Sequence, residues 1–316
     1  MRTVRATSVA ETRRGRRGRL LFLAIDHRES FAREVLGASL LDRGSATRVQ
    51  EAKRVVFDGL VIAAESGEVA PEEVSLLIDE RYGGDIPALA RRRGMPVAIA
   101  VERSGREIFE FEYGDGFEEH IERSDPDFSK VLVRFNPERD RVADDLQLDR
   151  LELLGTTLAR QGRGFLFELL VPPTDRQLAE AGDILTYEIE VRPGLIEAAM
   201  ARIQARGIEP DVWKVEGIDS PAAAARVAAQ ARAEERWADV SCTVLGAGAS
   251  DERVRTWLEV AARTAGYEGF AIGRSIWRDP LLGYLSGELD REAVTGEVAR
   301  RYLRFARIYE DALATR

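Results

Sequence analysis

Residues 164–217 begin with GFLFELLV (164–171), continue through RPGLIEAAMARIQAR (192–206) and end with VWKVEG (212–217). The first and last pieces are apolar runs of strand length, and the middle piece carries Leu, Ile, Met and Ala at helical spacing. A strand, a helix and a second strand in this order are typical of a βαβ unit, whose two strands are parallel.

The same alternation extends over the chain. Six further apolar runs lie at residues 20–26, 74–79, 96–102, 130–136, 240–247 and 269–276. Eight parallel strands are the number that closes a (β/α)₈ barrel. The alternative is an open doubly wound sheet, but the first run leads into Asp26-His27-Arg28 rather than a glycine-rich dinucleotide fingerprint. We therefore predict an α/β protein with a single (β/α)₈ TIM barrel over residues 20–316 and a C-terminal helical cap from about Asp290.

The composition limits the classes of function. The chain has 316 residues and a net charge of −9, which argues against a nucleic-acid partner. The single cysteine, Cys242, excludes an intramolecular disulfide, and no apolar run reaches the length of about 20 residues that spans a bilayer. We expect a soluble cytoplasmic protein with no membrane contact. Residues 1–19 contain seven arginines and one glutamate, so we expect a basic, disordered arm there.

Lysine is scarce, because the 46 basic residues include only Lys53, Lys130 and Lys214. Arginine serves as a surface cation, but only lysine can lose its proton and act as a nucleophile. Chance suffices to explain Lys53, which lies in a polar helical stretch. Lys130 and Lys214 lie in apolar runs, where a buried charge is costly unless it is paired or exposed at a site.

Acidic residues stand at or near the ends of several apolar runs, namely Asp26, Asp79, Glu102 and Glu168. Along residues 212–217, the period of two places Lys214 and Glu216 on one face of the strand. Buried charges are costly unless they are paired, and barrel active sites form at the C-terminal ends of the strands. These side chains therefore predict a site at that end, with a structural ion pair as the alternative for Lys214 and Glu216.

Two glycine-rich segments, LGAGAS (245–250) and AIGRS (271–275), follow the seventh and eighth runs. Loops at these positions of a barrel commonly bind phosphate through backbone N–H groups, and an arginine adds a charged donor. We predict a phosphate site formed by Gly246, Ala247, Gly248, Gly273 and Arg274.

The residue inventory narrows the chemistry. Two histidines and one cysteine are too few for a typical zinc enzyme, and no nucleophile-elbow motif is present. The carboxylates could hold Mg²⁺. Alternatively, a lysine could attack a ketose carbonyl, form a Schiff base and assist carbon–carbon cleavage. The amine must first lose its proton, which a second cation such as Lys130 would favour.

Several motifs together resemble a known family: LAIDHRESF (23–31), LLIDERYG (76–83), VERSGREIFEFEYGDGF (101–117), KVLVRFNP (130–137), FLFELLVPP (165–173), DVWKVEG (211–217), VLGAGAS (244–250) and GFAIGRSIWRDP (269–280). They resemble the class I aldolases of the tagatose 1,6-bisphosphate aldolase type. They are more similar to the domain C-terminal to some inositol-catabolism sugar kinases, which is associated with 2-deoxy-5-keto-gluconate 6-phosphate aldolase activity. The resemblance runs from about residue 20 to 290.

The resemblance implies roles for individual residues. Lys214 matches the Schiff-base lysine, Glu168 the proton shuttle, Lys130 a second active-site lysine and Asp26 an acidic substrate contact. Arg28 and Asp79 are further candidates for substrate binding. The expected substrate is a phosphorylated ketose or keto-sugar acid, cleaved to dihydroxyacetone phosphate and, for the closer relatives, malonate semialdehyde. No metal or cofactor is expected.

The sequence departs from the family at one position and leaves other points open. The tagatose enzymes have a serine where this chain has Gly246. Lys130 begins its apolar run, so Arg134 and Asn136 on the same face compete for the role of second active-site group. A Mg²⁺-dependent lyase that uses Asp79, Glu102 and Glu168, or a sugar-phosphate-binding barrel without activity, are the alternatives. Whether the chain forms a homo-oligomer is open.

Overall fold

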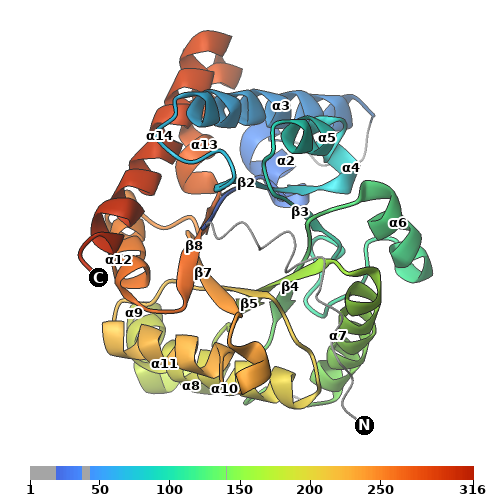
Figure 1. The fold of residues 1–316 in the computed structure, drawn as a ribbon, viewed down its shortest axis with the longest axis vertical. Coiled ribbons are helices and arrows are strands. Elements are labelled where there is room, and N and C mark those ends of the chain that lie inside the picture. The colour runs from blue at the N-terminus through green and yellow to red at the C-terminus, as the bar shows by residue number, and fades with distance from the viewer. Residues whose placement is uncertain (1–18, 38–42, 140) are drawn as a thin grey trace.

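The computed structural model describes residues 19–37, 43–139 and 141–316. Eight parallel strands close into a barrel in the order β1-β2-β3-β4-β5-β6-β7-β8, and helices surround it (Figure 1). The predicted (β/α)₈ barrel is therefore confirmed. The predicted basic arm lies outside the described residues except for Arg19, whose guanidinium pairs with Glu73 and Glu310.

The strands agree closely with the apolar runs of the sequence. They are β1 (Leu20–Ala24), β2 (Val74–Asp79), β3 (Val97–Ala100), β4 (Phe128–Arg134), β5 (Gly164–Leu170), β6 (Val212–Val215), β7 (Ser241–Leu245) and β8 (Tyr267–Ile272). Two strands begin two residues before their predicted starts, β4 at Phe128 and β8 at Tyr267. The predicted end of the eighth run at residue 276 is wrong, because β8 ends at Ile272 and Arg274 begins a helix.

Helices fill the connections between the strands. The α-helices are α2 (Glu29–Leu36), α3 (Arg43–Glu65), α4 (Glu80–Gly83), α5 (Ile86–Arg92), α6 (Phe117–Ser124), α7 (Arg141–Gln161), α8 (Asp175–Ala181), α9 (Ile184–Thr186), α10 (Arg192–Ala205), α11 (Pro221–Ala231), α12 (Asp251–Arg263), α13 (Arg274–Ser286) and α14 (Arg291–Leu313). Short 3₁₀ or π turns are η1 (Gly114–Gly116), η2 (Tyr187–Val191) and η3 (Glu235–Trp237).

The core has two layers because side chains alternate across each strand. Inside the barrel lies a small apolar cluster that includes Phe22, Leu166 and Val212. The larger layer between the strands and the helices includes Trp213 and Val215, as the period of two in β6 predicts. Other positions that face the inside of the barrel, including that of Lys214, carry polar side chains.

The C-terminal helix α14 begins where the sequence predicts and packs beside α3 and α12 on the outside of the barrel (Figure 1). Its tyrosines bond to the strands at which the barrel closes. The hydroxyl of Tyr302 donates to the carbonyl of Leu21 in β1 (2.7 Å), and that of Tyr309 donates to the carbonyl of Tyr267 in β8 (3.0 Å). The helix therefore supports the seam between the first and last strands.

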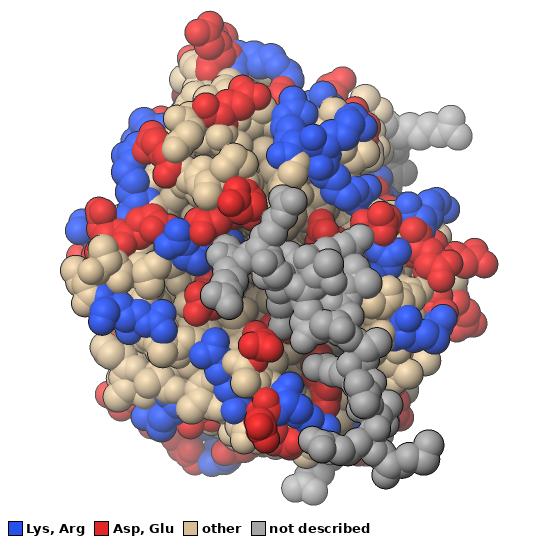
Figure 2. Space-filling view, in the orientation of Figure 1, with Lys and Arg blue, Asp and Glu red and all other residues tan. Residues whose placement is uncertain are grey.

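Acidic and basic side chains are interspersed over most of the face seen in Figure 2. Within the described ranges, none of the helices combines the length and the apolar character needed to cross a membrane.

Candidate active site

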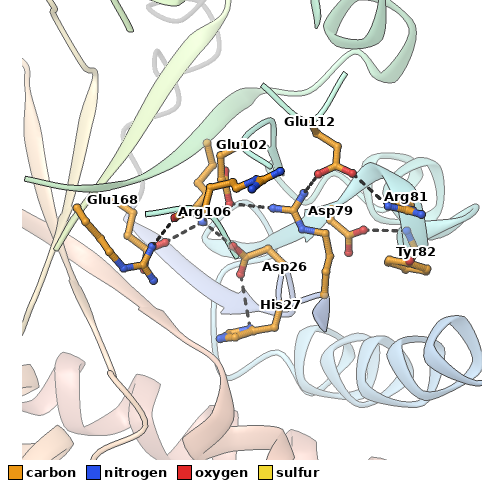
Figure 3. Close-up of polar contacts among 12 residues, drawn as sticks. Asp26, His27, Asp79, Arg81, Tyr82, Glu102, Arg106, Glu112 and Glu168 are labelled. Atoms are coloured by element: carbon orange, nitrogen blue, oxygen red, sulfur yellow. Dashed lines mark hydrogen bonds and ion pairs between the residues drawn. The ribbon is translucent and has the colours of Figure 1, made fainter. Parts of the chain in front are cut away.

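Lys130 stands at the centre of a buried charge cluster. Because β4 begins at Phe128, Lys130 lies within the strand, and its long side chain carries the amine to three carboxylates. Its Nζ lies 2.7 Å from Asp26 Oδ2, 2.9 Å from Glu102 Oε1 and 2.9 Å from Glu168 Oε2. Figure 3 shows the three carboxylates gathered around one point. A single ammonium group on β4 thus contacts one carboxylate inside β5 and two carboxylates that follow the ends of β1 and β3.

Glu168 connects this cluster to Lys214. The register of β5 and β6 places the two residues opposite each other, and Glu168 Oε1 lies 2.9 Å from Lys214 Nζ. The other oxygen of the same carboxylate contacts Lys130. Lys130, Lys214 and Glu168 are only 1%, 4% and 7% exposed. One buried carboxylate therefore bridges the two lysines that the sequence singles out.

The charges determine which members of the cluster are ionised. Burial tends to raise the pKa of Glu168, but the positive charges of Lys130 and Lys214 outweigh burial and lower this pKa. The same balance holds the pKa of Asp26 well below its ordinary value. Burial alone would lower the pKa of Lys130, yet its carboxylate neighbours raise this pKa well above the ordinary value. Lys130 therefore keeps its proton, which suits a fixed cation and not a nucleophile.

Arg28 extends the cluster toward the surface. Its guanidinium donates to Glu102 Oε1 (3.1 Å) and Glu112 Oε2 (3.1 Å), and Glu112 also contacts Arg81 (3.4 Å) (Figure 3). Burial raises the pKa of Glu102 despite the nearby charges of Lys130 and Arg28. The predicted substrate residue Arg28 is thus buried and engaged by two carboxylates.

Sequence reasoning missed Glu112. The chain folds back after β3, where Glu102 forms an antiparallel bridge with Phe111, and this places Glu112 near Glu102. The stretch from 101 to 117 matches the resembling family, but nothing in its local pattern marks Glu112 among its several acidic residues.

Asp79 occupies a separate ion pair. It is fully buried, its Oδ2 pairs with Lys53 Nζ, and its Oδ1 accepts a hydrogen bond from the backbone N–H of Tyr82 (2.8 Å) at the start of α4. Neither oxygen contacts Lys130. The attribution of Lys53 to chance is wrong, because its side chain is fully buried in this ion pair. The signal that could have identified it is its position four residues after Val49, on the apolar face of α3.

The competing residues on β4 lie elsewhere. Arg134 donates to the backbone carbonyl of Arg106 (3.1 Å), and Asn136 donates to Gln177 Oε1 (2.7 Å). Of the three candidates, Lys130 is the one that contacts Asp26 and Glu168. Glu216 pairs with Arg192 (3.2 Å) and not with Lys214, so the two same-face residues of β6 have different partners.

The loops after β7 and β8 meet at Arg274. Its guanidinium donates to the carbonyl of Ala247 (3.2 Å) and pairs with Glu34 (3.3 Å). Ala247 and Gly248 both have positive φ values, 49° and 72°, so the backbone turns sharply here. Helix α13 starts at Arg274, and Gly273 is its N-cap residue. The structure thus brings the predicted phosphate segments together.

His27 lies between these loops and the lysine cluster. Its Nδ1 is 3.8 Å from Asp26 Oδ1, and its ring packs edge-on against Trp277 (5.7 Å between centroids). A Cβ on Gly273 would lie 3.2 Å from His27 Cε1. Burial lowers the pKa of His27 to about 4, so its imidazole is neutral at pH 7.

The three carboxylates that the magnesium alternative requires as ligands all contact lysines in the structure. Within the described part of the chain, no group of three or more His, Cys, Asp or Glu residues is arranged to hold a metal ion. Of the three carboxylates expected as ligands, Asp79 pairs with Lys53, while Glu102 and Glu168 both contact Lys130. A lysine ammonium therefore occupies the point where the last two carboxylates meet.

No curated protein matches the chain. A family model described as "Uncharacterized protein conserved in bacteria (DUF2090)" matches residues 3–313. Eight-stranded parallel barrels are common among enzymes, and this fold is compatible with an aldolase. Because the match spans nearly the whole length, the chain belongs to the DUF2090 family.

Proposed function

We propose that the protein is a class I aldolase that cleaves a phosphorylated ketose or keto-sugar acid through a Schiff base on Lys214. The observation that carries this proposal is the buried carboxylate of Glu168, which lies 2.9 Å from the amines of both Lys214 and Lys130. A nucleophilic lysine needs an adjacent group that accepts and returns protons, and Glu168 meets this requirement.

The reaction begins when the Glu168 carboxylate takes a proton from the Lys214 ammonium group and the free amine attacks the substrate carbonyl. Glu168 then returns this proton to the hydroxyl of the carbinolamine, which leaves as water. The resulting iminium withdraws electrons from the bond between the two carbons that lie α and β to it. As that bond breaks, Glu168 takes the proton of the hydroxyl that becomes the aldehyde. Protonation of the enamine and hydrolysis of the iminium release the ketone product and restore Lys214.

Lys130 acts as a positioning residue in this scheme. Three carboxylates hold its ammonium group, and its charge in turn favours the ionised form of Glu168. Asp26, which also contacts Lys130, accepts a hydrogen bond from a substrate hydroxyl in this scheme. The cluster thereby separates two functions, because Lys214 reacts while Lys130 stays charged.

The phosphate of the substrate binds to Gly246, Ala247, Gly248, Gly273 and Arg274. A guanidinium has five N–H donors, and the contacts of Arg274 with Ala247 and Glu34 leave donors for a phosphoryl oxygen. The resemblance of the sequence motifs to the inositol-catabolism domain favours a 2-deoxy-5-keto-gluconate 6-phosphate-like substrate, with dihydroxyacetone phosphate as one product.

Borohydride trapping tests the proposal. Dihydroxyacetone phosphate with borohydride should leave a stable adduct on Lys214, which peptide mass spectrometry can locate because the chain has only three lysines. Lys214→Arg keeps a charge but cannot form the imine, so it should give no adduct. An adduct on Lys130 would reverse the roles of the two lysines. Cleavage of the substrate without an adduct on any lysine would refute the Schiff-base mechanism.

A further inference from the structure

Ser275, the second residue of α13, carries a hydroxyl group with no evident structural purpose. Its Oγ is buried and has no hydrogen-bond partner among the residues that the structure describes. A buried hydroxyl without a partner is unfavourable by roughly 1–3 kcal/mol, and native proteins seldom tolerate one unless a ligand or water completes it.

The Ser275 hydroxyl faces the turn after β7. A Cβ built on Gly246 would lie 3.6 Å from Ser275 Oγ, so the hydroxyl reaches the first residue of that turn. Ala247 and Gly248 continue the turn with positive φ. The hydroxyl thus lies where the loops after two neighbouring strands, β7 and β8, approach each other.

The same place is equipped for an anion. Arg274 precedes Ser275 and bonds to the carbonyl of Ala247, which sets its guanidinium across the turn. Gly248 permits this approach, since a Cβ there would lie 3.1 Å from Arg274 Cζ. Next to Gly273, His27 Nδ1 is a second buried polar atom that has no hydrogen-bond partner in the described ranges, although it lies 3.8 Å from Asp26 Oδ1.

We propose that the Ser275 hydroxyl donates a hydrogen bond to a phosphoryl oxygen of the ligand and so forms part of the phosphate site together with Arg274. The inference rests on the proposed phosphate site of the two loops and adds to it a residue that the sequence did not indicate. Arg274 supplies charge, whereas a hydroxyl supplies a short, directional donor that a phosphate monoester can use.

Binding of inorganic phosphate, measured by calorimetry on the full chain, tests the role of Ser275 without requiring turnover. Ser275→Ala should weaken binding about tenfold or more, because a hydrogen bond to a charged group is lost. Ser286→Ala at the other end of α13 is the matched control. Its hydroxyl donates to the carbonyl of Gly283, so phosphate affinity should not change.

A second variant separates the hydroxyl from packing effects. Gly246 does not have a positive φ, so it can accept a side chain, although its Cβ would lie 3.2 Å from Ile272 Cγ2 and needs a small adjustment there. In the Ser275→Ala background, Gly246→Ser would return a hydroxyl to nearly the same place from the opposite loop. Phosphate affinity should recover at least in part.

Three results would overturn the inference: no saturable phosphate binding by the wild type, an unchanged affinity in Ser275→Ala, or no recovery in the double variant. A failure of the proposed aldolase function would look different. In that case borohydride trapping at Lys214 would fail, while phosphate binding would still depend on Ser275.

Discussion

Replacing Lys130 with methionine should destabilise the protein by about 3–5 kcal/mol at pH 7, the range found when one partner of a buried ion pair is removed. Methionine has a similar length but no charge. The ammonium group now lies 2.7 Å from Asp26 and 2.9 Å from both Glu102 and Glu168. Without it, three buried carboxylates would face one another with fewer cations to compensate them.

The loss should depend on pH with a definite sign. In the wild type the pKa of Asp26 is held far below its ordinary value, so ionised Asp26 contributes stability above the pKa of about 3.9 that it has in the unfolded chain. This contribution disappears as the pH falls through the folded-state pKa. In the variant the pKa values of Asp26 and Glu168 rise, and the folded state takes up protons at a higher pH. The difference in stability should therefore be largest near pH 7 and shrink toward pH 4.

Urea denaturation at pH 7 and pH 5, followed by tryptophan fluorescence, measures this difference. The double variant Lys130→Met with Asp26→Asn is the control, because removing one carboxylate should recover part of the loss. A destabilisation below about 1 kcal/mol at pH 7 is far short of the cost of breaking a buried pair. It would contradict the claim that the Lys130 ammonium group stabilises the buried carboxylates. So would a loss that stays constant with pH, because linkage requires it to change.

Three further predictions concern single residues. Glu168→Gln should still form the borohydride adduct but turn over about 10²–10⁴-fold more slowly, and an unchanged kcat would remove Glu168 from proton transfer. Arg274→Ala should raise KM for the phosphorylated substrate by roughly ten- to a hundredfold with a smaller effect on kcat, which steady-state kinetics can separate. Gly269→Ala should lower the free energy of unfolding by at least about 2 kcal/mol. The reason is that a Cβ there would lie 2.1 Å from the carbonyl oxygen of Leu20 across the barrel seam, and thermal denaturation would detect the change.

The strands and the barrel could be predicted from the sequence because they depend on local patterns. Each strand is a short apolar run bounded by turn residues, and eight of them alternating with helical patterns are typical of one closed topology. The barrel in turn places the C-terminal ends of all strands on one face. Asp26 ends the first apolar run, and Glu168 and Lys214 lie on neighbouring strands. The topology of the barrel is therefore enough to predict that the three side chains meet on that face.

The ion pairs required the tertiary structure. Lys130 and Asp26 are 104 residues apart, and whether the amine of Lys130 or the guanidinium of Arg134 meets the acids depends on the start of β4 and the reach of each side chain. Asp79 could equally have joined this cluster, but Lys53 of α3 holds it in a pair of its own. The sequence by itself determined the barrel and the end of it that carries the charges, because hydrophobic periodicity is local. The tertiary structure alone decided which charge meets which, because buried ion pairs form only within a few ångströms and strand register sets those distances.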